Sequence, residues 1–295
     1  MRLRKRKAEV QPDEDQVEDV QHAVHAGMEG GHKPNGKDAK ARIDTDDPVT
    51  HFKIPFNEKE IICERRGGQS PGKQPKLIFT HGAGGGLTAP ATKDFADGFA
   101  DAADVVSFQG TMNLKSRVKA FHTVIEHEGV KSETALGGRS MGARAAVIEA
   151  IEGEQKTKAL VLVSFPLVGG KKGDSREQIL LDLPAGVDVL FISGDRDSMC
   201  NLAHLADVQA QMEARSWTVI VEGADHGMSW KWKDGVEAMR RKTGALAAEW
   251  LGDRDVSKQS RSLSWDEESG EVRCNDWANA GETSCLLYTS PSPRD

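Results

Sequence analysis

Short apolar runs alternate with helix-patterned segments through the middle of the chain. The runs are continuously apolar, which is typical of strands buried on both faces of a sheet. The helical segments instead carry apolar residues at spacings of three and four. This order predicts an α/β fold with a doubly wound, mostly parallel sheet. In such sheets, functional residues gather at the carboxyl ends of the strands.

The pattern places most of these elements. The predicted strands are Lys76–Thr80, Asp104–Phe108, Thr134–Leu136, Ala159–Val163, Val187–Ile192 and Trp217–Val221. The predicted helices are Leu114–Glu128, Met141–Glu152, Leu202–Ala214 and Val236–Leu251. Ahead of them, His51–Phe56 alternates and Glu60–Arg65 follows after a short polar turn, which predicts an antiparallel hairpin at the sheet edge.

The uneven distribution of apolar residues divides the chain. All nine Phe lie between Phe52 and Phe191. Residues 1–49 are charged and hold few large apolar side chains, so they cannot offset the entropy cost of ordering and are predicted to be a disordered arm. Residues 253–284 are similarly polar and are predicted to be a disordered tail. One α/β domain is therefore expected at residues 50–252.

The C-terminal segment 285–295 has a sequence of unusual origin. Its residues, Cys-Leu-Leu-Tyr-Thr-Ser-Pro-Ser-Pro-Arg-Asp, match one reading frame of a transposase-type sequencing adapter residue for residue. We therefore interpret this segment as non-native and set it aside from the fold. The alternative is a natural tail rich in Ser and Pro.

Composition narrows the classes of function. The 295 residues carry 39 Lys and Arg against 46 Asp and Glu, which gives a net charge of −7. This acidity argues against a nucleic-acid binder, which would show a basic face. No run approaches the ~20 apolar residues of a membrane-spanning helix, and no apolar signal-peptide core follows the basic start. We expect a cytoplasmic protein. Nuclear import through Arg2–Lys7 is an alternative, and a protein partner bound through the charged arm is a candidate.

A nucleophile motif lies between a predicted strand and a predicted helix. Gly138-Arg139-Ser140-Met141-Gly142 fits G-x-S-x-G, and the strand–turn–helix context gives this short pattern its meaning. Gly138 and Gly142 let neighbouring segments approach closely, and the helix start favours negative charge beside Ser140. The alternative is a plain glycine-rich turn with a surface serine.

Two later loops supply an acid and a base. Phe191–Asp197 ends a predicted strand in a Gly-x-x-Asp turn, and Asp225-His226-Gly227 follows another strand. The chain order nucleophile, acid, base is one that serine hydrolases use. His226 is expected to take the proton of Ser140, because a serine hydroxyl is a poor nucleophile until a base activates it. Asp197 is expected to hold the imidazole in its productive tautomer.

A glycine-rich loop, residues 80–86, follows the first parallel strand with the sequence Thr-His-Gly-Ala-Gly-Gly-Gly. The backbone N–H groups of Ala83 and Met141 are expected to stabilise the oxyanion of a tetrahedral intermediate. His81 and Gly82 belong to the same motif. A phosphate-binding loop is disfavoured, because Leu87 stands where the Lys of such a loop would be.

With these four elements, the chain resembles the α/β-hydrolase superfamily. Within it, the chain resembles the small hydrolase-like family that includes a testis-expressed protein and a subunit of the NSL histone-acetyltransferase complex. The resemblance covers about residues 70–252. It implies that the acid closes the Gly-x-x-Asp turn, which favours Asp197 over the alternative, Asp195. The strings that carry the resemblance are Thr80-His-Gly-Ala-Gly-Gly, Gly137-Gly-Arg-Ser-Met-Gly-Ala-Arg144, Ser164-Phe-Pro-Leu167, Gly194-Asp-Arg-Asp197 and Asp225-His226-Gly.

Two places depart from the pattern of these relatives. Phe108-Gln109-Gly110 stands where relatives show an aromatic–Pro pair, and Ser198-Met199-Cys200 lacks their aromatic–Gly. Both places could line the pocket, so the substrate stays open. Ser164–Val187, where many such proteins insert a lid, is too short and polar for a lid domain.

The leading hypothesis is therefore a lidless serine hydrolase that acts on a soluble or acylated substrate through an acyl-Ser140 intermediate. No cofactor is expected. No metal site is expected either, because His22, His25 and His32 lack a partnering Cys pair. The alternative is a non-catalytic hydrolase fold that serves as a scaffold in a protein complex of the chromatin-associated type.

Overall fold

The computed structural model of the chain describes residues 49–67, 74–169, 173–230 and 233–279. Residues 1–48 of the predicted N-terminal arm and the adapter-like segment 285–295 lie outside these residues. Ten strands form the central sheet of the described part. They are β1 Val49–Phe56, β2 Lys59–Arg66, β3 Leu77–Thr80, β4 Val105–Phe108, β5 Ala135–Arg139, β6 Ala159–Val163, β9 Asp188–Gly194, β10 Arg215–Val221, β11 Ser260–Asp266 and β12 Glu271–Cys274.

The strand order is β1-β2-β4-β3-β5-β6-β9-β10-β11-β12. From β4 to β11, every neighbouring pair is parallel, and the antiparallel pairs β1–β2, β2–β4 and β11–β12 lie toward the two edges. The residues of β3, β6 and β9 are all buried, as their continuous apolar pattern predicts. The predicted fold class, α/β with a mostly parallel sheet, is confirmed.

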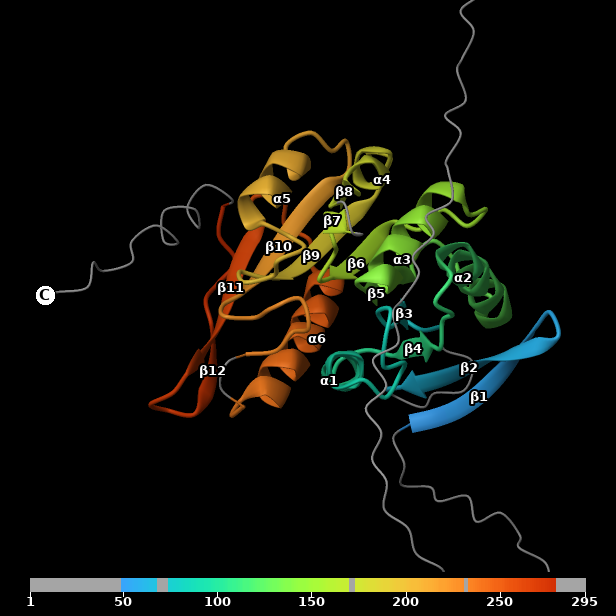
Figure 1. Cartoon of the computed structure of the whole chain (residues 1–295), viewed down its shortest axis with the longest axis horizontal. Coiled ribbons are helices and arrows are strands. Elements are labelled where there is room, and N and C mark those ends of the chain that lie inside the picture. Colours follow the sequence, from blue (N-terminus) through green and yellow to red (C-terminus); the bar gives the residue numbers. More distant parts are fainter. Residues whose placement is uncertain (1–48, 68–73, 170–172, 231–232, 280–295) are drawn as a thin grey trace, which may run out of the picture. The chain divides into compact units, whose positions relative to one another are not determined.

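Helices cover both faces of the sheet (Figure 1). They are α1 Pro90–Ala100, α2 Leu114–Glu128, α3 Met141–Glu152, α4 Gln178–Leu181, α5 Leu202–Gln209 and α6 Val236–Gly252. One core cluster joins one sheet face to α1 and α6 through Phe95, Phe99 and Leu246. A second joins the other face to α2, α3, α4 and α5 and contains Phe121 and Leu205. None of the helices in the described ranges has the length and apolar content to cross a bilayer.

Helix α1 lies where the pattern predicts no element. Its inward contacts rest on Phe95 and Phe99, one turn apart, with Gly98 between them. Two aromatic residues, with the poor helix former Gly98 between them, give too weak a periodic signal to predict a helix. Packing of the two rings under the sheet supplies the stabilisation that local propensity lacks, and Phe95 stacks on Phe79 of β3 with ring centroids 4.5 Å apart.

The segment between β6 and β9 is small. It forms the short antiparallel pair β7 Val168–Gly169 and β8 Asp174–Ser175, followed by α4. Residues 170–172 lie outside the described part. The described residues of this segment therefore contain no separate lid domain.

The prediction of a disordered tail at 253–284 is wrong for the residues that the structure describes. Strand β11 pairs in parallel with β10, and β12 returns antiparallel to β11. Leu263 is fully buried against α6, and the ring of Trp265 packs so closely on Gly235 that a Cβ there would lie 2.4 Å from it. The mean polarity of the segment hid this strand, because Leu263 is the only apolar residue of β11 that is fully buried and most of the other residues are polar and half-buried.

We expect Leu263→Ala to lower the free energy of unfolding by about 2–4 kcal/mol, because it removes a fully buried side chain and leaves a cavity. The matched control is Val256→Ala in the same C-terminal segment. Val256 is 52% exposed, so its loss should change the free energy by less than about 0.5 kcal/mol. Urea unfolding of both variants measures the difference, and equal effects would contradict the packing of β11 on the core.

Candidate active site

Ser140 stands at a sharp turn between β5 and α3. Its backbone has φ 51° and ψ −112°, a conformation that costs energy in a residue with a side chain. The two motif glycines make this turn possible. A Cβ on Gly138 would lie 2.4 Å from the carbonyl carbon of Gly142, and a Cβ on Gly142 would lie 2.5 Å from the carbonyl oxygen of Thr80. The turn therefore depends on direct backbone packing.

Three side chains form one hydrogen-bonded chain. The Oγ of Ser140 lies 2.9 Å from Nε2 of His226. The Nδ1 of His226 lies 2.9 Å and 3.0 Å from the two carboxylate oxygens of Asp197. A carboxylate can only accept, so Nδ1 carries the proton and the Nε2 of a neutral ring is free to accept from the serine hydroxyl. Three residues from loops far apart in the sequence thus meet at the carboxyl ends of β5, β9 and β10.

The structure brings Asp197, and not Asp195, to His226. The side chain of Asp197 is fully buried and also accepts a hydrogen bond from the N–H of Met199 at 2.8 Å. Asp195 turns away, and its carboxylate accepts the N–H of Gly223 at 2.6 Å. Met199 belongs to the loop that departs from the pattern of relatives. Its contact with Asp197 uses a backbone N–H, so it does not depend on which side chain stands there.

The loop that carries His226, residues 222–229, is held by hydrogen bonds of its own. The Oδ1 of Asp225 accepts the N–H groups of Gly227 at 2.7 Å and Ser229 at 3.0 Å. Such an Asx turn fixes the loop from inside. The ring of His226 remains partly open to solvent, with 24% of its side chain exposed. It is therefore rigidly placed and still accessible to a small molecule.

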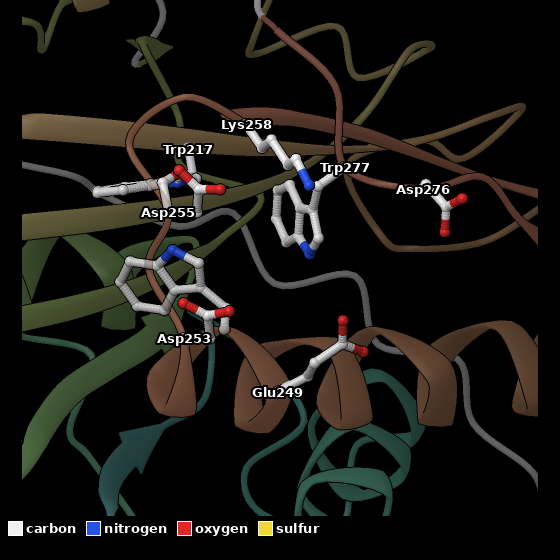
Figure 2. A pocket seen from close by; sticks show the side chains of 8 residues that line it. Trp217, Glu249, Asp253, Asp255, Lys258, Asp276 and Trp277 are labelled. Carbon is white, nitrogen blue, oxygen red and sulfur yellow. Dashed lines mark hydrogen bonds between the residues drawn. The ribbon is translucent and has the colours of Figure 1, made fainter.

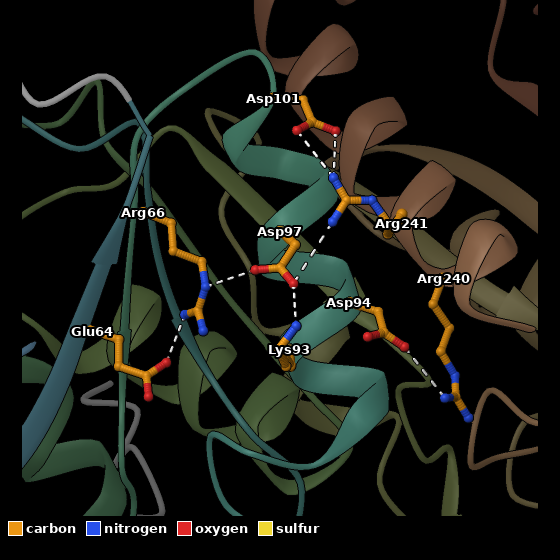
Figure 3. Close-up of polar contacts among 8 residues, drawn as sticks. All are labelled: Glu64, Arg66, Lys93, Asp94, Asp97, Asp101, Arg240 and Arg241. Atoms are coloured by element: carbon orange, nitrogen blue, oxygen red, sulfur yellow. Dashed lines mark hydrogen bonds and ion pairs between the residues drawn. The ribbon is translucent and has the colours of Figure 1, made fainter. Parts of the chain in front are cut away.

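Two arginines donate hydrogen bonds to backbone carbonyls of this loop. Arg139, the variable residue before Ser140 in the motif, donates from Nη2 to the carbonyl oxygen of His226 at 2.5 Å. Arg240 of α6 donates from Nε to the carbonyl of Met228 at 2.7 Å and pairs with Asp94 of α1 at 3.4 Å (Figure 3). Burial lowers the pKa of Arg139. The motif pattern treats position 139 as free, so sequence reasoning missed this contact.

The glycine-rich loop lies beside Ser140. A Cβ built on Gly82 would be 3.5 Å from the Cβ of Ser140. Within the described residues, the N–H of Ala83 has no protein acceptor. The N–H of Met141 belongs to the first turn of α3, where no intrahelical acceptor exists. Two backbone donors are therefore unengaged in the segments that flank the serine.

His81 is buried under the same loop as a neutral ring. Its Nδ1 lies 2.6 Å from the carbonyl oxygen of Gly82, and its Nε2 accepts the N–H of Gly110 at 3.0 Å. These partners require the proton on Nδ1. Burial, and next the nearby Arg117 cation, lower the pKa of His81 from 6.5 to about 4. The Nε2 of Gln109 also lies 2.9 Å from Nε2 of His81. The segment Phe108-Gln109-Gly110, which departs from the pattern of relatives, therefore contacts the glycine-rich loop.

A scan against family models matches residues 73–249 to the family described as "Alpha/beta hydrolase domain". The chain belongs to the alpha/beta hydrolase domain family. Among solved structures, it is similar to Est1E from Butyrivibrio proteoclasticus, with 14% identity and a TM-score of 0.53 over 69% of this chain and 99% of that one.

Two further structures show the same alpha/beta hydrolase fold. An alpha-beta serine hydrolase homologue from Coxiella burnetii has 16% identity and a TM-score of 0.51, over 67% of this chain and 96% of that one. The thioesterase domain from the curacin biosynthetic pathway has 15% identity and a TM-score of 0.52, over 70% of this chain and 99% of that one. At these identities, the likeness establishes the fold.

Arg117 of α2 is a fully buried polar group near this site, and sequence reasoning missed it. Nη1 donates to the carbonyl oxygens of His81 and Gly82, the latter at 3.0 Å. Nε and Nη2 both donate to the carbonyl of Thr111, at 2.9 Å and 2.7 Å. Burial lowers the pKa of Arg117 to about 10, so it stays a cation at neutral pH.

Two cavities lie away from the three-residue chain. One of about 300 Å³ is at the C-terminal end of α6 (Figure 2). A larger one of about 800 Å³ runs along α5 and β10. Neither is lined by Ser140, Asp197 or His226, although Asp195 reaches the larger one. In the part of the chain that the structure describes, no three His, Cys, Asp or Glu side chains gather so as to hold a metal ion.

The titration of His81 generates a prediction on stability. Its pKa of about 4 in the folded state lies below the unfolded value of 6.5, so the unfolded chain binds the proton first. Stability should therefore fall as the pH drops from 6.5 to 4, by up to about 1.4 kcal/mol per pH unit for this group. In His81→Gln this component should be absent, because the amide does not titrate.

Urea unfolding at several pH values between 7 and 4 measures this difference between His81→Gln and the parent protein. The matched control is His51→Gln, since the side chain of His51 is 61% exposed on β1. Parallel pH curves for His81→Gln and the parent would show that His81 is not buried as a neutral ring.

Proposed function

We propose that this protein is a serine hydrolase that cleaves a carboxylic ester or thioester through an acyl-Ser140 intermediate. The observation that carries the proposal is the hydrogen-bonded chain from Ser140 through His226 to Asp197, with Ser140 held in a strained turn at a helix start. Family membership supports it, because the alpha/beta hydrolase fold commonly presents such a serine.

In the proposed reaction, Nε2 of His226 takes the hydroxyl proton as Oγ of Ser140 bonds to the substrate carbonyl carbon. The carbonyl π electrons move to oxygen, and the N–H groups of Ala83 and Met141 stabilise that oxyanion. The imidazolium, held by Asp197, then gives its proton to the leaving alcohol or thiol as its bond to carbon breaks. Water repeats the sequence on the acyl-Ser140 ester and releases the acid. All proton transfers use groups of this chain and water.

The small segment between β6 and β9 supports a substrate that arrives from solution. A lipid substrate at an interface is usually met by a large apolar lid, and the described part of this segment holds only β7, β8 and α4. The ring of His226 is partly exposed, which fits direct access. We therefore propose a small soluble ester or thioester, or an acyl group tethered to a soluble carrier.

A scaffold role is the second candidate. It is favoured by the likeness of the string from Gly137 to Arg144 to a hydrolase-like subunit of a chromatin complex. A fluorophosphonate probe separates the two, because it reacts only with an activated serine. Labelling of the parent protein that is lost in Ser140→Ala supports the hydrolase, whereas a folded parent protein that resists the probe supports the scaffold.

Ser140→Ala should abolish hydrolysis of p-nitrophenyl acetate and leave thermal stability nearly unchanged, because the hydroxyl lies at a strained turn outside the core. In the parent protein, kcat/KM should rise with pH and then level off, because His226 accepts a proton only as the neutral ring. Steady-state rates from pH 5 to 9 measure this. Activity and a pH rise that persist in Ser140→Ala would contradict the mechanism.

Asp197→Asn should lower kcat by a factor of about 10⁴, because an amide favours the wrong tautomer of the imidazole. The matched control is Asp195→Asn two residues away, since an amide oxygen at position 195 can still accept the N–H of Gly223. Its kcat should stay close to that of the parent. The reverse ranking of the two variants would show that Asp195 is the acid.

A further inference from the structure

Arg117 is a buried cation whose hydrogen-bond partners among the described residues are all backbone carbonyls. Four hydrogen bonds run from its guanidinium to the carbonyl oxygens of His81, Gly82 and Thr111. Within the described residues, no carboxylate pairs with it. A buried charge is costly unless it is hydrogen-bonded, so its position is fixed by these carbonyls. In this way, Arg117 ties α2 to the loops that follow β3 and β4.

The carbonyl of Gly82 and the N–H of Ala83 belong to one peptide unit. A trans peptide is planar, and its C=O and N–H point in opposite directions. The Gly82 oxygen accepts from Nη1 of Arg117 at 3.0 Å and from Nδ1 of His81 at 2.6 Å. The N–H of Ala83 therefore points away from the guanidinium, and it is unengaged within the described residues. Two donors on the oxygen also polarise the unit, which makes this N–H a stronger donor.

The same peptide unit lies against the nucleophile turn. Gly82 is near enough that a Cβ on it would be 3.5 Å from the Cβ of Ser140. The Gly82–Ala83 peptide thus links the guanidinium of Arg117 to the neighbourhood of Ser140. Fixed dipoles aimed at developing negative charge are a major source of rate enhancement.

We propose that Arg117 is a positioning residue that orients and polarises the Gly82–Ala83 peptide, so that the N–H of Ala83 binds the oxyanion. The inference rests on the proposed hydrolase function and deepens it. Arg117 itself touches neither substrate nor Ser140. It acts through the peptide, and Gly110 gives it room, because a Cβ on Gly110 would lie 2.5 Å from Nε of Arg117.

Arg117→Met should lower kcat for p-nitrophenyl acetate by about 10–100-fold, part of the 10²–10³-fold that loss of a whole oxyanion donor costs. KM should change little, because the ground-state carbonyl gains less from the donor than the oxyanion does. The pH dependence should keep its shape, since His226 and Asp197 are untouched. Arg117→Lys keeps the charge and one donor group, so it should recover much of the loss.

Phenylboronic acid tests the oxyanion directly, because it forms a tetrahedral adduct with an activated serine. Its affinity should fall in Arg117→Met by about the same factor as kcat/KM. Gly110→Ala should lower both in the same direction by displacing the intact guanidinium, and it serves if Arg117→Met does not fold. Arg66→Met is the matched control. Arg66 is a buried arginine paired with Glu64 and Asp97 (Figure 3), so its loss should lower Tm and leave kcat unchanged.

The possible results are separable. Parallel losses of kcat and boronate affinity in Arg117→Met and Gly110→Ala support the inference. A folded Arg117→Met with kcat within about twofold of the parent, or with lowered kcat and unchanged boronate affinity, overturns it while Ser140-dependent hydrolysis stands. A parent protein without Ser140-dependent hydrolysis refutes the proposed function, and the oxyanion role of Arg117 falls with it.

Discussion

The geometry of the site depends on how closely the chain at the end of β3 packs against the first turn of α3. The carbonyl oxygens of Thr80 and His81 occupy the space in which a side chain at position 142 would stand. This backbone contact forces the sharp turn at Ser140 and lays the glycine-rich loop beside it. A single packing constraint between backbone segments therefore places Ser140 beside the proposed oxyanion donors.

Two ionisable side chains, Arg117 and His81, are buried near this contact, and only Arg117 is charged. The cation of Arg117 is spread over peptide carbonyls, whereas His81 in the same place is kept neutral by burial. A second cation there would repel the first and break the contact with the N–H of Gly110. On the other side, Asp197 is buried against His226, and Arg139 holds the loop backbone rather than the carboxylate. Hydrogen bonds from buried arginines therefore fix both the glycine-rich loop and the loop that carries His226.

The meeting of Ser140, Asp197 and His226 could be predicted from the sequence, because each of them follows a buried strand and the proposed chemistry tolerates few residue types. Helix α1 could not, because Phe95 and Phe99 alone give too weak a periodic signal, and β11 and β12 could not, because most of their residues are polar. Arg117 was hidden for another reason. The helical spacing of Val118, Phe121, His122 and Ile125 predicts the inner face of α2 only in part. Phe121 and Ile125 are buried, but Arg117 and Val124 are buried as well, whereas Val118 and His122 are half-buried. A periodicity count assigns a charge to the surface, and only the three-dimensional structure shows that carbonyls satisfy it.

The packing of Trp265 on Gly235 links strand β11, through α6, to the loop that carries His226. Gly235 is the N-cap of α6, and Arg240, five residues further along, donates to the carbonyl of Met228 in the His226 loop. A side chain gained at position 235 would push against the indole, and its backbone would also have to adopt the left-handed φ of 77° that favours glycine. Position 235 should therefore favour glycine whichever residue stands at position 265. The family match covers residues 73–249, so Gly235 lies inside the matched segment and Trp265 lies outside it.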